Sequence, residues 1–114
     1  MSTLSGEDYS VEFNEGARCV SIRGTLRLGG LPEYAPLMDL LLQAVEQCDT
    51  LTLDLRELEF LNSSGIAALS KFVIRARDGD GRHLVILGSQ SIPWQGKSLN
   101  NLKRLMPTLE LRIE

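Results

Sequence analysis

The chain has 114 residues, of which 43% are hydrophobic and only 5% aromatic, so it is long enough for one domain with an aliphatic core. Its 12 basic and 15 acidic residues give a formal net charge of −3 and are interspersed along the sequence, which argues against nucleic acid as a ligand. Lys97, Lys103 and Arg104 form only a small basic cluster, which we interpret as a solvated helix face.

Residues 1–16 lack the basic start and the apolar stretch of a secretory signal, and no segment approaches the roughly 20 apolar residues of a membrane span. We therefore expect a single domain over residues 1–114 in a soluble cytoplasmic protein. Cys19 and Cys48 lie in apolar-periodic segments, and neither they nor His83 has a second metal ligand at suitable spacing. We expect two reduced core cysteines, a partly exposed histidine at the start of a strand, and no metal or other cofactor.

The first half of the chain alternates between strand and helix patterns. Two segments in which apolar and polar residues alternate flank a turn at Asn14-Glu15-Gly16. A longer segment follows in which apolar residues recur every three or four positions, as in a helix, and Pro36 fits its first helical turn. In order, these patterns predict strands over Tyr9–Phe13 and Ala17–Arg23, a helix from Glu33 or Tyr34 to Gln47, and a strand over Leu51–Leu55. A charged turn over Arg56–Glu59 is expected to follow, before the apolar pair Phe60-Leu61.

The second half continues the same alternation. A helical face runs from Ile66 to Ala76 and is ended by Asp78-Gly79-Asp80-Gly81. Leu84–Leu87 is a continuous apolar run, typical of a strand covered on both faces. Ser98 is placed to cap a short helix from Leu99 to about Met106, which Pro107 ends, and a strand follows over Leu109–Ile113. Strands that alternate with helices predict an α/β protein with a mixed sheet.

The most informative segment joins the hydrophobic strand to the next helix through Asn62-Ser63-Ser64-Gly65. This arrangement resembles the signature of STAS domains, the family of bacterial anti-sigma factor antagonists and of the cytoplasmic tails of sulfate transporters. Members commonly have Asp-Ser-Ser-Gly at the start of a helix after such a strand. The resemblance implies a STAS-type mixed β-sheet of about five strands with about three helices packed mainly on one face, and an exposed serine turn.

In antagonist members of that family, an anti-sigma kinase phosphorylates a serine of the turn and a phosphatase restores binding. The acceptor is the second serine of the pair, so the resemblance implies phosphorylation of Ser64, with Ser63 as the alternate. It further implies a non-enzymatic protein-binding module with a serine-kinase or anti-sigma-type partner. The residues expected at the partner surface are Asn62, Ser63, Gly65, Ile66, Trp94 and Lys97. Because Asn62 stands where many phosphorylated members have Asp, a constitutive scaffold without a phosphate cycle is the alternative.

The physical chemistry of the turn is consistent with a switch. Asn62 and Ser63 are both good N-cap residues, and a phosphate on Ser64 would lie near the positive end of the helix. It would add about −1.5 to −2 charges to a docking surface. The simpler interpretation, in which Asn-Ser-Ser-Gly is only a helix cap, would account for one of the two serines.

The segment Ser91–Ser98 superficially resembles the phosphate-binding loop G-x-x-x-x-G-K-[ST], but Ser91 replaces the first glycine. Pro93 and Trp94 also disfavour a loop whose backbone N–H groups must curl around a phosphate. Trp94 has two equal interpretations, as an interface anchor or as a side chain folded back over the sheet edge. Catalysis has little support because His83 is the single histidine and a nucleophile elbow is absent. No residue favours a small-ligand sensor.

Overall fold

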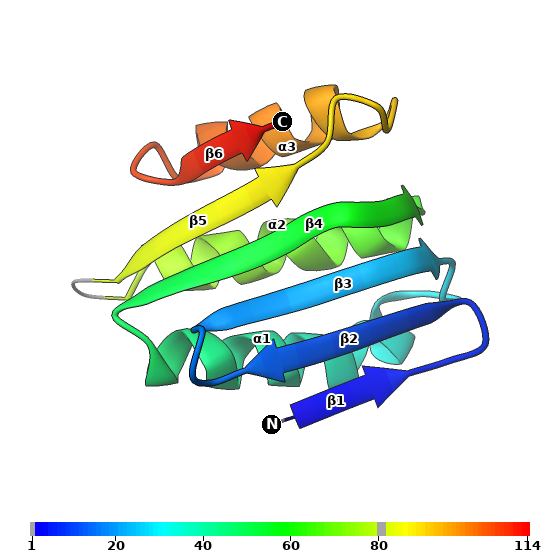
Figure 1. Ribbon diagram of the computed structural model, residues 1–114, viewed down its shortest axis with the longest axis horizontal. Coiled ribbons are helices and arrows are strands. Elements are labelled where there is room, and N and C mark those ends of the chain that lie inside the picture. Colours follow the sequence, from blue (N-terminus) through cyan, green and yellow to red (C-terminus); the bar gives the residue numbers. More distant parts are fainter. Residues whose placement is uncertain (1, 80–81) are drawn as a thin grey trace.

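The computed structural model describes residues 2–79 and 82–114, which form a six-stranded sheet with the helices on one face (Figure 1). The strands are β1 (Ser2–Ser5), β2 (Tyr9–Asn14), β3 (Cys19–Leu26), β4 (Thr50–Leu61), β5 (His83–Gly88) and β6 (Glu110–Ile113). The helices are the 3-10 turn η1 (Leu31–Tyr34), α1 (Ala35–Gln47), α2 (Ser63–Arg77) and α3 (Gln95–Leu105). The predicted α/β class and mixed sheet are confirmed, with six strands in place of about five.

The spatial order of the strands follows the chain. β1, β2 and β3 pair antiparallel, and β3, β4, β5 and β6 pair parallel. Parallel neighbours need a crossover, and α1, α2 and α3 supply the three crossovers on one side of the sheet. The core lies between this helical layer and the sheet and is almost entirely aliphatic, as the composition predicts.

β1 is the strand that sequence periodicity does not find. It has four residues and its one apolar side chain, Leu4, pairs opposite Val11 of β2. A single apolar residue among serines and threonine is too short a pattern to show a period of two.

β4 runs without interruption from Thr50 to Leu61, so the predicted charged turn over Arg56–Glu59 is wrong. Two register shifts against β3 each insert one extra residue into β4. These bulges change the spacing of its buried side chains from two residues to three, through Leu55, Leu58 and Leu61. A period of three with charges between the leucines resembles a turn or helix in sequence.

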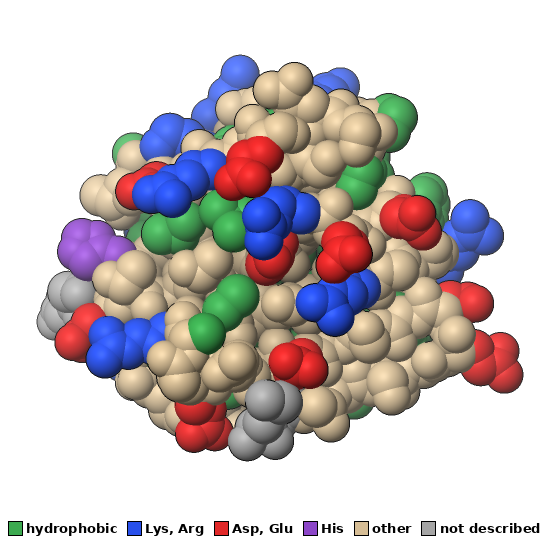
Figure 2. All heavy atoms as spheres, in the orientation of Figure 1, with side chains coloured by type: hydrophobic (Ala, Val, Ile, Leu, Met, Phe, Trp, Pro, Cys, Tyr) green, Lys and Arg blue, Asp and Glu red, His purple; other side chains and the backbone are tan. Residues whose placement is uncertain are grey.

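The helix-free face of the sheet carries interspersed basic and acidic side chains around a few hydrophobic ones (Figure 2). Val85 and Leu87 of β5 point to this face and are half-buried, so helices cover only one face of that strand, contrary to the prediction. Cys19 is also half-buried here, whereas Cys48 is buried in the core. Both thiols are free, and the expectation of two core cysteines holds only for Cys48.

The last helix begins earlier than predicted. α3 starts at Gln95, so Ser98 lies inside the helix and is not its N-cap. α2 ends at Arg77 as expected, but Asp80 and Gly81 of the predicted stop signal lie outside the described residues. His83 is the exposed first residue of β5, as predicted. None of the described helices is both long and apolar enough to cross a membrane.

Candidate functional site

The serine turn lies at the edge of the sheet where the parallel strands end. β3, β4 and β5 point to the same edge, and α2 and α3 both begin there (Figure 1). The loops that follow these strands therefore meet beside residues 62–65. In open α/β sheets, the carboxyl ends of the strands are the usual place for a binding site.

Asn62 is the N-cap of α2 and joins three segments of the chain. Its Oδ1 accepts hydrogen bonds from the Gly65 amide at 3.0 Å and from the Tyr34 hydroxyl at 2.7 Å. Its Nδ2 donates to the Leu28 carbonyl at 2.8 Å. The amide orientation is determined by these partners, because a backbone N–H can only donate and a carbonyl can only accept. Asn62 therefore acts here both as a helix cap and as a clamp on the loop after β3.

Tyr34 holds the Asn62 side chain in place by a hydrogen bond from the core. Its side chain is fully buried, and its hydroxyl accepts from the Leu28 amide at 3.4 Å while donating to Asn62. Burial raises the pKa of the Tyr34 hydroxyl, so it stays protonated and remains a donor at physiological pH. Gly65 is required beside it, because a Cβ at that position would lie 2.7 Å from the Tyr34 oxygen and closer still to Leu61.

The two serines differ in exposure. Ser63 is exposed and Ser64 is half-buried, and neither hydroxyl forms a hydrogen bond with a described residue. The amides of Gly65 and Ile66 are bound by the side chain and carbonyl of Asn62. The first two amides of α2 have no such partner among the described residues, so this end of the helix can receive an acceptor.

Exposed hydrophobic side chains flank the turn. Leu31 in η1 is 39% exposed and Phe60 near the end of β4 is 38% exposed, and they are the large apolar residues most open to solvent in the described chain. The guanidinium carbon of Arg27 lies 4.6 Å from the centre of the Phe60 ring. Figure 2 shows hydrophobic side chains at this edge, near the tip of β4 and over the loop that follows β5. Large apolar side chains exposed close to a loop of this kind can contribute to a protein interface.

Trp94 folds back onto β4, as one of its two interpretations predicts. Its indole nitrogen donates to the carbonyls of Leu58 at 3.2 Å and Glu59 at 3.1 Å. The half-buried ring packs together with Ile66 at a shallow apolar hollow between α2 and α3. The structure thus brings Trp94 and Ile66 together beside the serine turn. Lys97 lies exposed on the first turn of α3, and Gly65 is buried.

Gln95 is the positioning residue that sequence reasoning missed. Its side chain is fully buried; Nε2 donates to the carbonyls of Leu55 at 2.6 Å and Leu58 at 3.0 Å, and Oε1 accepts from the Ser89 amide at 2.7 Å. It satisfies β4 carbonyls where that strand diverges from β5. No local signal marks it, because its partners are main-chain atoms on another strand.

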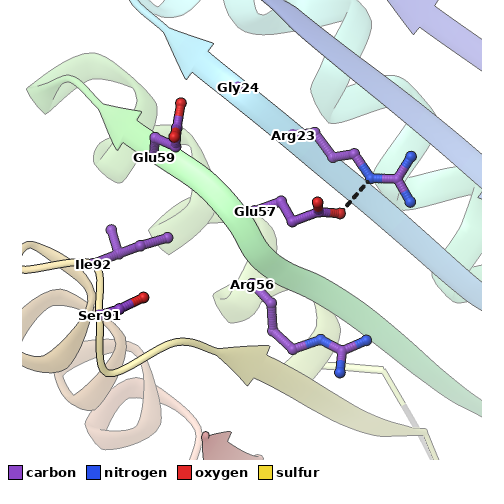
Figure 3. A pocket seen from close by; sticks show the side chains of 7 residues that line it. All are labelled: Arg23, Gly24, Arg56, Glu57, Glu59, Ser91 and Ile92. Atoms are coloured by element: carbon purple, nitrogen blue, oxygen red, sulfur yellow. Dashed lines mark ion pairs between the residues drawn. The ribbon is translucent and has the colours of Figure 1, made fainter.

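An open depression of about 490 Å³ lies beside the bulged part of β4 (Figure 3). Its two arginines are already paired: Arg23 Nε is 2.8 Å from Glu57 Oε2, and Arg56 binds Asp54 and Glu114. The contacts with Arg56 hold the pKa of the Asp54 carboxyl below its usual value. The described residues of this depression leave no unpaired cation for an anionic ligand, so it does not extend the candidate site.

Comparison with known proteins gives matches in structure but not in sequence. No family model matches the chain, and no curated protein is recognisably similar to it. SiaC from Pseudomonas aeruginosa, in a complex with the diguanylate cyclase SiaD that it activates, superposes with a TM-score of 0.74 at 15% identity over 100% of both chains. Apo-SiaC gives a TM-score of 0.73 at 15% identity, over 100% of this chain and 99% of the other.

An anti-sigma factor antagonist from Mycobacterium paratuberculosis also superposes, with a TM-score of 0.66 at 21% identity over 94% of this chain and 90% of the other. The chain has a STAS-type fold. The STAS-type proteins that resemble it are regulatory binding proteins. At these identities the likeness concerns the fold, so roles for individual residues of this STAS-type domain depend on its own geometry.

Proposed function

We propose that this STAS-type domain is a non-enzymatic cytoplasmic regulator that binds a protein partner through the serine turn and is switched by phosphorylation of Ser64. The supporting observation is the position of the turn, at the end of the sheet where the parallel strands finish and where Leu31 of η1 and Phe60 of β4 are exposed. A serine-kinase or anti-sigma-type protein is the proposed partner. Two fold neighbours support partner binding: one is in a complex with the enzyme that it activates, and the other is an anti-sigma factor antagonist.

The local geometry gives the switch a physical basis. A phosphate on Ser64 would lie at the start of α2, where the helix dipole and the first amides favour negative charge. The domain can therefore carry the modification without unfolding. A partner that fits the neutral, partly apolar surface would instead meet about −1.5 to −2 added charges and the cost of desolvating them.

Absence of catalysis is part of the proposal. His83 begins β5 and thus lies at the opposite edge of the sheet from Ser64, so it cannot serve as a base for that hydroxyl. The carboxylates of Glu57 and Glu59 are exposed on β4. Among residues 2–79 and 82–114, no base lies at hydrogen-bond distance from the Ser64 hydroxyl, as nucleophilic catalysis by that serine would need.

The test is phosphorylation by a serine kinase of the anti-sigma type from the same cells, with ATP, followed by intact-mass measurement. The wild-type chain should gain one phosphate and Ser64→Ala should gain none. Ser70→Ala is the matched control, because Ser70 lies on the same helix and its hydroxyl donates to the Ile66 carbonyl at 2.9 Å. Phosphorylation that persists in Ser64→Ala and disappears in Ser63→Ala would move the acceptor to the alternate serine. A chain purified from its own cells that never carries phosphate would contradict the switch.

A constitutive scaffold is the second candidate. Asn62 favours it, since that residue stands where many phosphorylated STAS members have Asp. The clamp gives Asn62 another reason to be an amide, because a carboxylate could not donate to the Leu28 carbonyl. The scaffold predicts that Ser64→Asp and Ser64→Ala bind the partner alike, whereas the switch predicts that only Ser64→Asp loses binding.

A further inference from the structure

The fold gathers half of the basic residues onto two neighbouring helices. α2 and α3 carry six of the 12 Lys and Arg residues and no Asp or Glu. The other six basic and all fifteen acidic residues lie elsewhere, which leaves the rest of the chain with a net charge of −9. The six cations are all exposed, and they are Lys71, Arg75 and Arg77 on α2 and Lys97, Lys103 and Arg104 on α3. The interspersion of charge along the sequence therefore does not extend to the surface of these two helices.

The two helices form one continuous surface. They begin at the same edge of the sheet and run side by side, with Ile66, Trp94 and Ser98 lining one hollow at their starts. At their ends, Arg77 donates to the Leu105 carbonyl at 3.3 Å. We call the outer surface of α2 and α3 the basic face.

Four cations of the basic face remain available. Arg77 is engaged by Asp78 and Lys103 donates to two carbonyls after α3. Lys71, Arg75, Lys97 and Arg104 form no ion pair with any described residue. A surface with four unpaired cations and no acid of its own attracts a negatively charged partner.

We propose that the basic face binds an acidic protein segment, one that also contacts the apolar residues at the start of α2. The adjacency of the two features favours a protein, because a phosphate backbone offers no counterpart for the half-buried side chains of Ile66 and Trp94, which meet between the starts of α2 and α3. A protein that makes 6–10 contacts with phosphates needs more cations than the four that are available here. The proposal rests on the proposed function, since it gives the chemical character of the partner that docks at the serine turn.

The test uses a twenty-residue poly-L-glutamate peptide as the probe and follows backbone amides of the full chain by NMR. Shift changes should be confined to residues 63–77 and 95–105, and the affinity should fall several-fold when salt is raised from about 0.05 to 0.3 M. Lys71→Gln/Lys97→Gln should weaken binding at least about threefold, as two surface ion pairs would. Arg18→Gln/Arg112→Gln is the matched control, since it removes the same charge from exposed sites off the two helices, and should change the affinity less than about twofold.

Several outcomes would overturn the proposal. They are shift changes spread over the whole surface, equal losses in the two double variants, or concentration-dependent shifts of the basic face without peptide, which would assign it to a second copy. Binding of a twenty-base-pair DNA duplex below about 1 µM at 0.15 M salt would make it a nucleic-acid site, since non-specific binding is usually weaker. Sedimentation with phosphatidylserine vesicles would make it a membrane surface. The Ser64 phosphorylation test is independent of all these results, so failure here leaves the proposed function standing.

Discussion

Replacing Asn62 by aspartate tests the clamp that holds the loop after β3 against α2. The change keeps the size of the side chain and the oxygen that accepts from Tyr34 and Gly65. It converts the donor to the Leu28 carbonyl into a second carboxylate oxygen, which would face that carbonyl across 2.8 Å. Two acceptors then oppose each other in a half-buried site.

The expected magnitude follows from three contributions. Loss of the donated hydrogen bond costs about 1 kcal/mol, and leaving the carbonyl without a donor adds about 1–2 kcal/mol. The negative charge of the new carboxylate at the N-terminus of α2 stabilises the folded state by about 0.3–1 kcal/mol, which offsets part of this loss. Asn62→Asp should therefore lower the free energy of unfolding by about 1–3 kcal/mol at pH 7. A protonated carboxyl can again donate to Leu28, so the deficit should disappear below the ordinary aspartate pKa of about 4.

Urea denaturation of wild type and variant at pH 7 and at pH 3.5 measures this difference. Asn101→Asp is the control, since it makes the same chemical change at an exposed position of α3 and should stay within about 0.5 kcal/mol of wild type. If Asn62→Asp is as stable as wild type at pH 7, the capping charge outweighs the clamp. The role assigned to the Leu28 hydrogen bond would then be wrong.

Three further predictions concern the supports of the site. Gly65→Ala should cost about 2 kcal/mol or more in thermal or urea unfolding, whereas Gly96→Ala, with open space around its Cβ, should be neutral or stabilising. Gln95→Leu should cost about 2–4 kcal/mol, because three buried main-chain groups lose their partner. Arg56 lowers the pKa of the Asp54 carboxyl, so the ionised carboxylate stabilises the folded state above about pH 4 and this stabilisation is lost as the pH falls. In urea unfolding, Asp54→Asn should therefore lose less stability than wild type between pH 5 and pH 3.

Local periodicity was sufficient to predict most of the elements. The hairpin of β2 and β3, the faces of α1 and α2, and the helix start at Asn62 each depend on residues close together in sequence. N-cap preference and three-and-four spacing are local properties, so they are visible without the fold. The serine turn could be found for the same reason.

The features that sequence missed depend on contacts between distant segments. The bulges of β4 exist only relative to β3, where Gly24 adopts φ 92° and a Cβ would collide with the Asp8 carbonyl. Gln95 acquires its role because β4 and β5 diverge beside it. The third hydrogen bond of Asn62 goes to a residue 34 positions away. None of these partners follows from composition or spacing.

The serine turn and the basic face occupy the same helix but act over different distances. Ser64 and Arg75 are eleven residues apart, which is about 16 Å along α2. That separation is about twice the screening length of roughly 8 Å at physiological salt. A phosphate on Ser64 would therefore leave the part of the basic face around Arg75 largely unneutralised and would act on the surface at the start of α2. An acidic partner could keep its attraction to α2 and α3 while losing its fit at the turn, so phosphorylation would chiefly accelerate dissociation and leave electrostatic encounter largely unchanged.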